Sequence, residues 1–194
     1  MTHPLNKKII NLMDDNDIRQ IVQNVVRKMI DSPQTDPPPA SPVAKRLVAL
    51  GADHGGFELK GVLKTEIESL GFTVMDVGTN SKEPVDYPDF AHSVAQMVGT
   101  GRAWRGIMID GAGIGSCIVA NKVPNVRAGM AYDVSSASNS REHNDTNVLT
   151  LGAGLIGVNL AKQIVKVWLT TDFGGDRHTK RVDKIKSVEK MYLK

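Results

Sequence analysis

The sequence predicts a protein of the α/β class, in which helices cover both faces of a five-stranded parallel sheet. From Lys45 onward, short apolar runs alternate with longer segments of helical periodicity, as is typical of such sheets. Polar residues follow directly after several of the apolar runs, which is where ligands bind in open parallel sheets. Together these two observations favour a three-layer α/β/α sandwich of the Rossmann-like kind.

Each predicted strand is a short apolar run, and each predicted helix carries apolar residues every three to four positions. The predicted strands span residues 46–51, 72–77, 107–109, 126–132 and 148–152. The predicted helices span residues 57–70, 89–98, 116–122, 134–143, 158–169 and 177–192. The helix at 116–122 is short because Pro124 cannot continue it.

The chain before the sheet is predicted to be a separate unit. Residues 1–31 read as an amphipathic helical extension that Asp17 can cap, and residues 32–45 as a proline-rich linker, which leaves residues 46–194 for the α/β domain. A helix on such a tether resembles the encapsulation peptides that carry enzymes into bacterial microcompartments, with a shell protein as its partner. The alternative is a helix that folds back on its own domain or makes a dimer contact.

Composition excludes several classes of protein. The net charge of +3 is too small to indicate a nucleic-acid partner. No apolar run reaches the roughly 18 residues that a membrane span needs, and the N-terminus lacks a secretory apolar region. The single cysteine, Cys117, excludes a disulfide framework within the chain and suits a reducing compartment; its apolar surroundings predict a buried core residue. We expect a cytoplasmic protein without a membrane partner.

The stretch around residues 106–120 combines a carboxylate with a glycine-rich turn. Asp110 stands where the third strand should end. The residues that follow it are Gly111, Gly113, Gly115 and Ser116, the last of which opens the predicted helix. Glycines let the backbone approach a ligand, and free N–H groups at a helix start favour an anion. The segment therefore predicts a candidate base beside donors for a developing negative charge; the alternative is a tight turn and nothing more.

Other polar residues follow the remaining strands. Asp53 and His54 come after the first strand, where the histidine could donate to a phosphate or a sugar hydroxyl, or the aspartate could simply cap the next helix. Tyr87 lies in the loop after the second strand, and Asp133 follows the fourth.

Two candidates lie further along the chain. His143 titrates near neutrality and could move protons, or it could stabilise a helix end with Asn144 in the left-handed cap position. Arg177 and Arg181 are four residues apart, so on a helix they share one face and suit a phosphate; the alternative is an exposed basic helix end.

These segments together resemble the type B ribose-5-phosphate isomerases and the related galactose-6-phosphate and allose-6-phosphate isomerases. The resemblance covers residues 46–194. The matching motifs are Gly51-Ala-Asp-His-Gly-Gly-Phe, Asp86-Tyr-Pro, Gly111-Ala-Gly-Ile-Gly, Ala120-Asn-Lys-Val-Pro, Arg141-Glu-His-Asn-Asp-Thr-Asn and Gly175-Asp-Arg-His-Thr-Lys-Arg.

The resemblance implies a metal-free and cofactor-free interconversion of an aldose phosphate with its ketose through an enediolate. It implies a site shared between the subunits of a homodimer, with a tetramer as the alternative. The implied catalytic residues are Asp110, His143, Gly111, Gly113 and Gly115, in which His143 assists ring opening and the glycine amides stabilise the enediolate oxygen. The implied substrate-binding residues are Asp53, His54, Tyr87, Ser116, Asn144, Arg177 and Arg181, the two arginines holding the phosphate.

The chain departs from the family at two places. Many members carry a cysteine base at the position of Asp110, and others a glutamate at that of Ser116. A desolvated carboxylate can act as base, although the nearby helix start favours its anion. After the fifth strand the family commonly has Gly-x-Arg, whereas this chain has Gly152-Ala153-Gly154, which predicts weaker phosphate binding or a different substrate.

The predicted activity is therefore the isomerisation of ribose 5-phosphate to ribulose 5-phosphate, a pentose phosphate pathway step, in the cytoplasm or inside a microcompartment. One alternative is a hexose or modified sugar phosphate as substrate. Another is a catalytically inactive homologue that serves as a microcompartment-associated binding protein. A third is a nucleotide-binding module, which the glycine loop faintly suggests.

Overall fold

The computed structural model describes residues 16, 19, 20, 23 and 46–192. The predicted helical extension, apart from those four residues, and the predicted linker lie outside the described residues. The α/β part is taken below by itself.

The sheet has five strands, all parallel, in the order β2-β1-β3-β5-β4. The strands are β1 (Leu47–Ala52), β2 (Thr73–Asp76), β3 (Arg105–Asp110), β4 (Ala128–Met130) and β5 (Val148–Gly152). The predicted fold class is thus confirmed. The two edge strands, β2 and β4, are shorter than predicted, because the sequence pattern does not show where a flanking residue loses its pairing partner.

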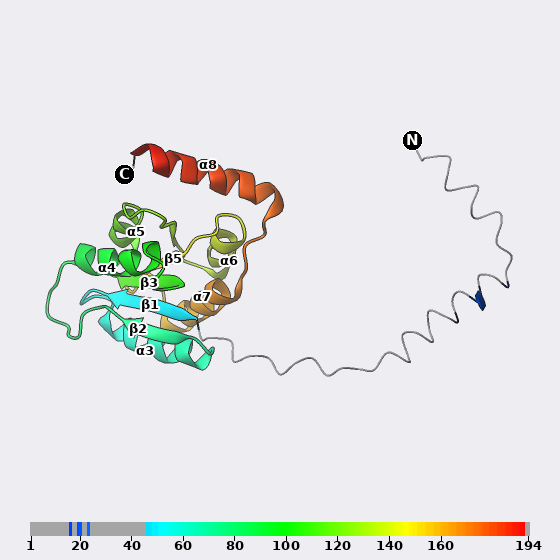
Figure 1. The fold of residues 1–194 in the computed structure, drawn as a ribbon. Coiled ribbons are helices and arrows are strands. Elements are labelled where there is room, and N and C mark those ends of the chain that lie inside the picture. Colours follow the sequence, from blue (N-terminus) through cyan, green and yellow to red (C-terminus); the bar gives the residue numbers. More distant parts are fainter. Residues whose placement is uncertain (1–15, 17–18, 21–22, 24–45, 193–194) are drawn as a thin grey trace. The chain divides into compact units, whose positions relative to one another are not determined.

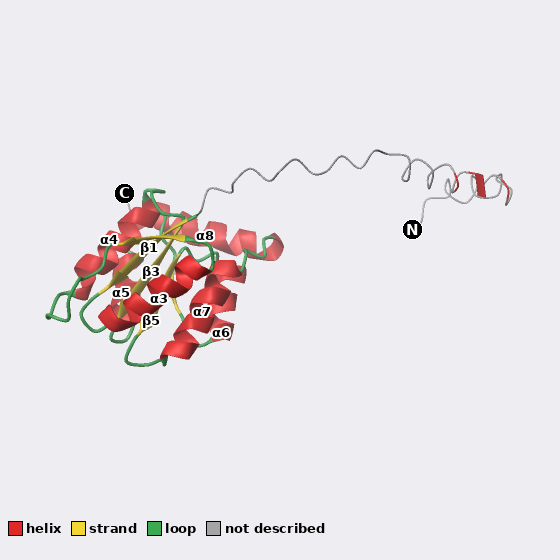
Figure 2. Cartoon of the chain, turned by 90° about the horizontal axis from the view of Figure 1, so that it is seen from below, coloured by secondary structure: helices red, strands yellow, loops and turns green. Residues whose placement is uncertain are grey.

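Helices form the outer layers of the sandwich. They are α3 (Phe57–Ser69), α4 (Tyr87–Gly99), α5 (Ile114–Ala120), α6 (Val134–Glu142), α7 (Val158–Thr170) and α8 (Asp176–Tyr192). Helices α3 and α7 lie on one face of the sheet and α4 and α5 on the other (Figures 1 and 2), while α6 packs beside α7. Helix α8 runs across the sandwich outside these layers (Figure 1).

Alternation along the central strands divides the core in two. In β1, Val48, Leu50 and Ala52 join the cluster under α3 and α7, whereas Ala49 joins the cluster under α4. All six residues of β3 are buried, as expected for a strand covered by helices on both faces. The sheet is therefore a rigid base from which short loops present side chains at its edges.

Within the described residues, no helix is long and apolar enough to span a bilayer.

Candidate active site

The first group of candidate residues lies where the strand order reverses. The chain runs from β1 outward to β2 and then returns to β3 on the other side, so the rule for open α/β sheets places the binding crevice beyond the carboxyl ends of β1 and β3. Pairing of Ala52 with Ile109 brings Asp53, the next residue along, beside Asp110, the last residue of β3. Both aspartates are more than nine-tenths buried.

The carboxylate of Asp110 accepts four hydrogen bonds from the loop that follows it. Oδ1 accepts from the amides of Ala112, at 2.8 Å, and Gly113. Oδ2 accepts from the amide of Ser116, at 3.3 Å, and from its hydroxyl. A carboxylate offers about four lone-pair positions, so these donors fill its capacity. Asp110 therefore folds the glycine loop around its own charge.

This finding corrects one expectation about the loop. The amides of Ala112, Gly113 and Ser116 are not free for a ligand, because the Asp110 carboxylate already holds them. Among the described residues, the backbone N–H groups of Gly111 and Gly115 have no hydrogen-bond acceptor. A Cβ added to Gly111 would meet no atom within 4 Å, so this glycine borders open space.

The glycines of the loop have separate reasons to be glycine. Gly113 is the N-cap of α5 and has a φ of 80°, which a side chain rarely tolerates. The ring of Tyr87 lies against Gly115, where an added Cβ would come within 2.5 Å of the phenol. Helix α5 begins at Ile114 rather than at Ser116, so Ser116 is a buried residue of its first turn.

Asp53 and His54 have different surroundings. Oδ1 of Asp53 accepts from the amide of Gly56, the N-cap of α3, at 3.0 Å, so this aspartate orders the turn that leads into the helix. Nδ1 of His54 lies 3.2 Å from both the carbonyl oxygen and the amide nitrogen of Val85. This contact ties the loop after β1 to the loop that leads into α4, whose first residue is Tyr87 rather than a loop residue as predicted.

The segment that replaces the family's Gly-x-Arg borders the same crevice. The amide of Ala153 donates to the carbonyl of Asp110 at 2.8 Å, and the amide of Gly154 donates to that of Gly111 at 3.0 Å. A side chain at position 154 would therefore start beside the glycine loop.

The second group of candidates lies at the opposite end of the strands. Helix α6 starts after the carboxyl end of β4 and runs back, so that its C-cap, His143, lies shortly before the amino end of β5. The amide of Gly174 donates to the carbonyl of Glu142 at 2.9 Å, which brings the start of α8 to the same place. One chain therefore keeps Asp110 and His143 at opposite ends of the strands.

Two neighbours that the sequence pattern did not single out hold His143. Its ring stacks on that of His178, with ring centres 4.1 Å apart and planes inclined by 10°. Its Nδ1 lies 2.9 Å from the amide nitrogen of Asn139, one helical turn earlier on α6. The spacing of four residues could have indicated Asn139, but nothing local links His143 to His178.

Three predicted residues around this group can be placed. Asn144 is exposed but is not in the left-handed region; that conformation belongs to Asp145, with a φ of 49°, so the predicted cap was one residue out. Arg177 and Arg181 are exposed on α8, and Nε of Arg177 donates to Nε2 of His178 at 3.3 Å. Burial of the His178 ring, and then the electrostatic effects of its neighbours His143, Arg177 and Arg181, lower the pKa of His178.

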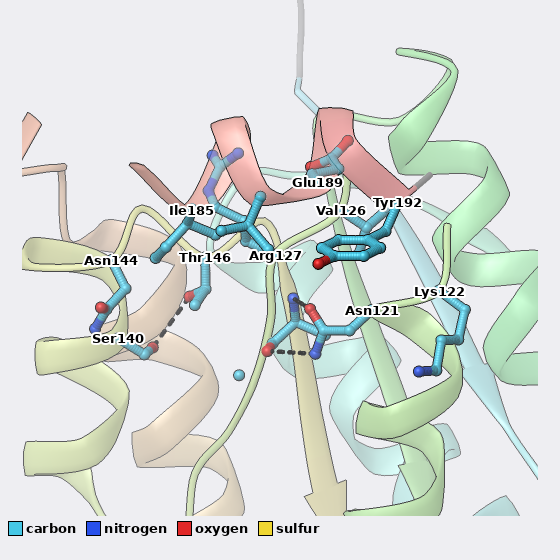
Figure 3. Close-up of a pocket in the computed structure, with 13 residues that line it drawn as sticks. Asn121, Lys122, Val126, Arg127, Ser140, Asn144, Thr146, Ile185, Glu189 and Tyr192 are labelled. Atoms are coloured by element: carbon cyan, nitrogen blue, oxygen red, sulfur yellow. Dashed lines mark hydrogen bonds between the residues drawn. The ribbon is translucent and has the colours of Figure 1, made fainter. Parts of the chain in front are cut away.

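A groove of about 560 Å³ lies between α8 and the body of the domain (Figure 3). Ser140, Asn144 and Thr146 line one side, and Ile185, Glu189 and Tyr192 of α8 line another (Figure 3). Asn144 therefore lies next to the apolar face of α8.

Cys117 is half-buried, and its Sγ approaches the carbonyl of Ala128 at 3.5 Å. Burial raises the pKa of this thiol, which suits a packing role rather than that of a nucleophile. Within residues 46–192, no three His, Cys, Asp or Glu side chains are grouped so that they could hold a metal ion.

Comparison with known proteins shows which protein family the sequence matches. A sequence model of the ribose/galactose isomerase family matches residues 48–185. Ribose-5-phosphate isomerase B of Escherichia coli is 44% identical over 142 residues, which cover 73% of this chain and 95% of that protein. D-erythrulose-4-phosphate isomerase of Pectobacterium atrosepticum is 39% identical over 140 residues, or 71% of this chain and 91% of that protein.

A solved structure gives the same result in three dimensions. The ribose-5-phosphate isomerase B of Clostridium thermocellum is 46% identical and superposes with a TM-score of 0.74, over 75% of this chain and 99% of that one. The similarity thus spans nearly the whole of these proteins and leaves the first part of this chain outside it.

Proposed function

Because the chain belongs to the ribose/galactose isomerase family, we propose that it is a sugar-phosphate isomerase that converts ribose 5-phosphate to ribulose 5-phosphate through an enediolate. The observation that carries the proposal is the buried Asp110 carboxylate at the rim of the sheet, directly beside the glycine loop.

In this proposal the rotatable hydroxyl of Ser116 turns away from Oδ2 of Asp110, and Asp110 uses the freed lone pair to remove the proton from the carbon next to the carbonyl. The electron pair left behind forms the enediolate, and the N–H groups of Gly111 and Gly115, which lack an acceptor among the described residues, donate to its oxygen. Asp110 then returns the proton to the neighbouring carbon, the former carbonyl carbon, while the hydroxyl proton of the enediolate passes from the oxygen on C2 to the oxygen on C1. Asp53, His54 and Tyr87 line the same crevice and hold the sugar hydroxyls. The amide of Ser116 keeps the carboxylate in place.

The remaining roles belong to the second group. His143 assists opening of the sugar ring, with Asn144 beside it, while Arg177 and Arg181 hold the phosphate. Because this group lies at the other end of the strands, a complete site needs a second copy of the chain. We therefore propose a homodimer in which each site takes Asp110 from one subunit and His143 from the other.

The apolar face of α8 supports this assembly. Ile185, Val188, Met191 and Tyr192 are between 45% and 79% exposed in the single chain. Such a run of exposed apolar side chains along one helix indicates a surface that another chain covers.

The test is an isomerase assay with purified protein on pentose, hexose and tetrose phosphates. We expect turnover of ribose 5-phosphate, and a fall of about 10²–10⁴-fold in kcat for Asp110→Asn, with the dimer intact. Since the substituted side chain would present an amide to the loop donors, circular dichroism and thermal unfolding must show that the variant is folded. Turnover at the wild-type rate by Asp110→Asn would refute the base assignment, and no turnover of any sugar phosphate by the wild-type protein would refute the proposed activity.

A different sugar phosphate is the second candidate substrate, and Gly154 favours it. This residue borders the crevice and offers no guanidinium. A relative of 39% identity is named for a four-carbon sugar phosphate, so the family accommodates other chain lengths. If ribose 5-phosphate is the substrate, Gly154→Arg should lower its KM; if a tetrose or hexose phosphate is turned over with the higher kcat/KM, the second candidate holds.

We also propose that residues 1–31 serve as an address, with a microcompartment shell protein as partner, in a protein otherwise of the cytoplasm. The proposal rests on the sequence pattern. Deletion of residues 1–40 should then leave activity and dimer formation unchanged, and loss of either would contradict it.

A further inference from the structure

The neighbours of His143 determine which of its ring nitrogens carries a proton. The amide nitrogen of Asn139 can only donate, and it lies 2.9 Å from Nδ1 of His143. A nitrogen that accepts a hydrogen bond from an N–H group holds a lone pair there and no hydrogen of its own. While this bond is made, the ring is neutral and its proton is on Nε2.

The other side of the ring agrees with this assignment. Oε1 of Glu142 lies 3.9 Å from Nε2 of His143, too far for a hydrogen bond, but its negative charge on that side favours a hydrogen on Nε2. A donor therefore faces one ring nitrogen and an acceptor lies toward the other. Both arrangements favour the tautomer with the hydrogen on Nε2.

The face of the ring is fixed as well. His178 of α8 stacks on His143, and His178 in turn accepts from Arg177 through its Nε2. The charged and titratable groups that act on this stacked pair of rings are Arg177 and Arg181 from α8, which act on His178, and Glu142 from α6. Stacking restricts rotation of the His143 ring, so that Nδ1 stays turned toward Asn139.

We propose that Asn139 is a positioning residue that keeps His143 in the neutral tautomer with Nε2–H, so that His143 acts as a hydrogen-bond donor to the sugar. The proposal rests on the proposed isomerase function and deepens the role of His143 in it. A neutral imidazole with its hydrogen on Nε2 donates to the ring oxygen of a cyclic sugar phosphate and polarises the bond that must open. Its Nδ1 lone pair is occupied by Asn139, so in this state His143 does not itself take up a proton.

The test reads the tautomer directly by NMR. Side-chain ¹H–¹⁵N correlation spectra of protein with ¹⁵N-labelled histidine distinguish protonated from unprotonated ring nitrogens, and His143→Gln assigns the signal among the five histidines. At about pH 7.5 we expect Nε2 of His143 to be protonated and Nδ1 not, because Nδ1 accepts from Asn139. Finding the hydrogen on Nδ1 in the wild-type protein would overturn the proposal.

The sharpest variant is Asn139→Asp, which replaces the donor with an acceptor. The carboxylate should draw a proton onto Nδ1, so that the spectrum of His143 changes to a protonated Nδ1, and kcat/KM for ribose 5-phosphate should fall about tenfold or more. Ser135→Asp is the matched control, because it adds the same charge to the exposed surface of the same helix, two turns before His143. This control should leave both readouts unchanged.

The outcomes separate this proposal from the proposed function. If Asn139→Asp leaves Nδ1 unprotonated, or changes it no more than Ser135→Asp does, Asn139 does not position His143. If the tautomer responds as expected while the wild-type protein turns over no sugar phosphate, the positioning by Asn139 holds and the isomerase function fails.

Discussion

The hydroxyl of Ser116 donates to Oδ2 of Asp110, and both side chains are buried at the start of α5. The amide of the same serine donates to the same oxygen at 3.3 Å. One residue thus supplies both of the hydrogen bonds that this oxygen accepts from the loop, and it ties the end of β3 to the first turn of the helix.

Ser116→Ala should destabilise the protein. It removes a buried hydrogen bond to a charged group and leaves Oδ2 of Asp110 with a single donor, which costs about 1–3 kcal/mol of unfolding free energy. Urea unfolding at a fixed protein concentration measures this loss. The control is Ser93→Ala, where an exposed serine hydroxyl donates to the carbonyl of Asp89 at 2.8 Å, and it should cost much less. Equal effects of the two variants would contradict a special role for Ser116.

Gly115→Ala should lower activity without lowering the free energy of unfolding. The added methyl group would come within 2.5 Å of the Tyr87 phenol, but Tyr87 is 38% exposed and can swing away. Because alanine is the better helix former, unfolding free energy should stay the same or rise by up to about 1 kcal/mol. The displaced phenol should lower kcat/KM. Tyr87→Ala should lower it to a similar extent, and the double variant should lose no more than either alone; additive losses would show that Gly115 acts independently of Tyr87.

Stability should depend on pH through His178. Its pKa is lowered in the folded protein, so the unfolded chain binds a proton more readily as the pH falls below the ordinary value of 6.5. The contribution of His178 to the free energy of unfolding is therefore fully present above pH 6.5, and it is lost as the pH falls toward the lower pKa that His178 has in the folded protein.

Thermal unfolding at a series of pH values tests this point. His178→Phe keeps a ring to stack on His143 and removes the titration, so its melting temperature should fall less steeply below pH 6.5 than that of the wild type. His92→Gln, at an exposed histidine on α4, is the control and should follow the wild-type curve. Parallel curves for all three proteins would exclude His178 as a source of the pH dependence.

Val188→Asp should break the proposed dimer. Val188 is 55% exposed on α8, and a carboxylate there would be buried without a partner if a second chain covers this face. Analytical ultracentrifugation should show monomers, and activity should be lost because the two groups of site residues no longer meet. Lys186→Asp, which introduces the same carboxylate at a charged, half-exposed position of the same helix, should leave the mass unchanged. A monomeric wild-type protein with full activity would refute the shared site.

The sequence determined the layers, the five strands and the placement of Asp110 before a glycine turn, because apolar periodicity and glycine spacing are local properties of the chain. It did not determine the lengths of β2 and β4, the start of α5 or the left-handed position at Asp145, since each depends on pairing and packing with distant residues.

The candidate site divides in the same way. Local pattern singled out Asp110, His143 and the two arginines. Only the tertiary structure decided that the Asp110 carboxylate holds three of the loop amides and that His143 stacks on His178. Only the tertiary structure, too, decided that the group around Asp110 and the group around His143 lie at opposite ends of the strands. The physical reason is that hydrogen-bond partners and strand direction are fixed when remote segments pack together, and a one-dimensional pattern carries no record of which segments those are.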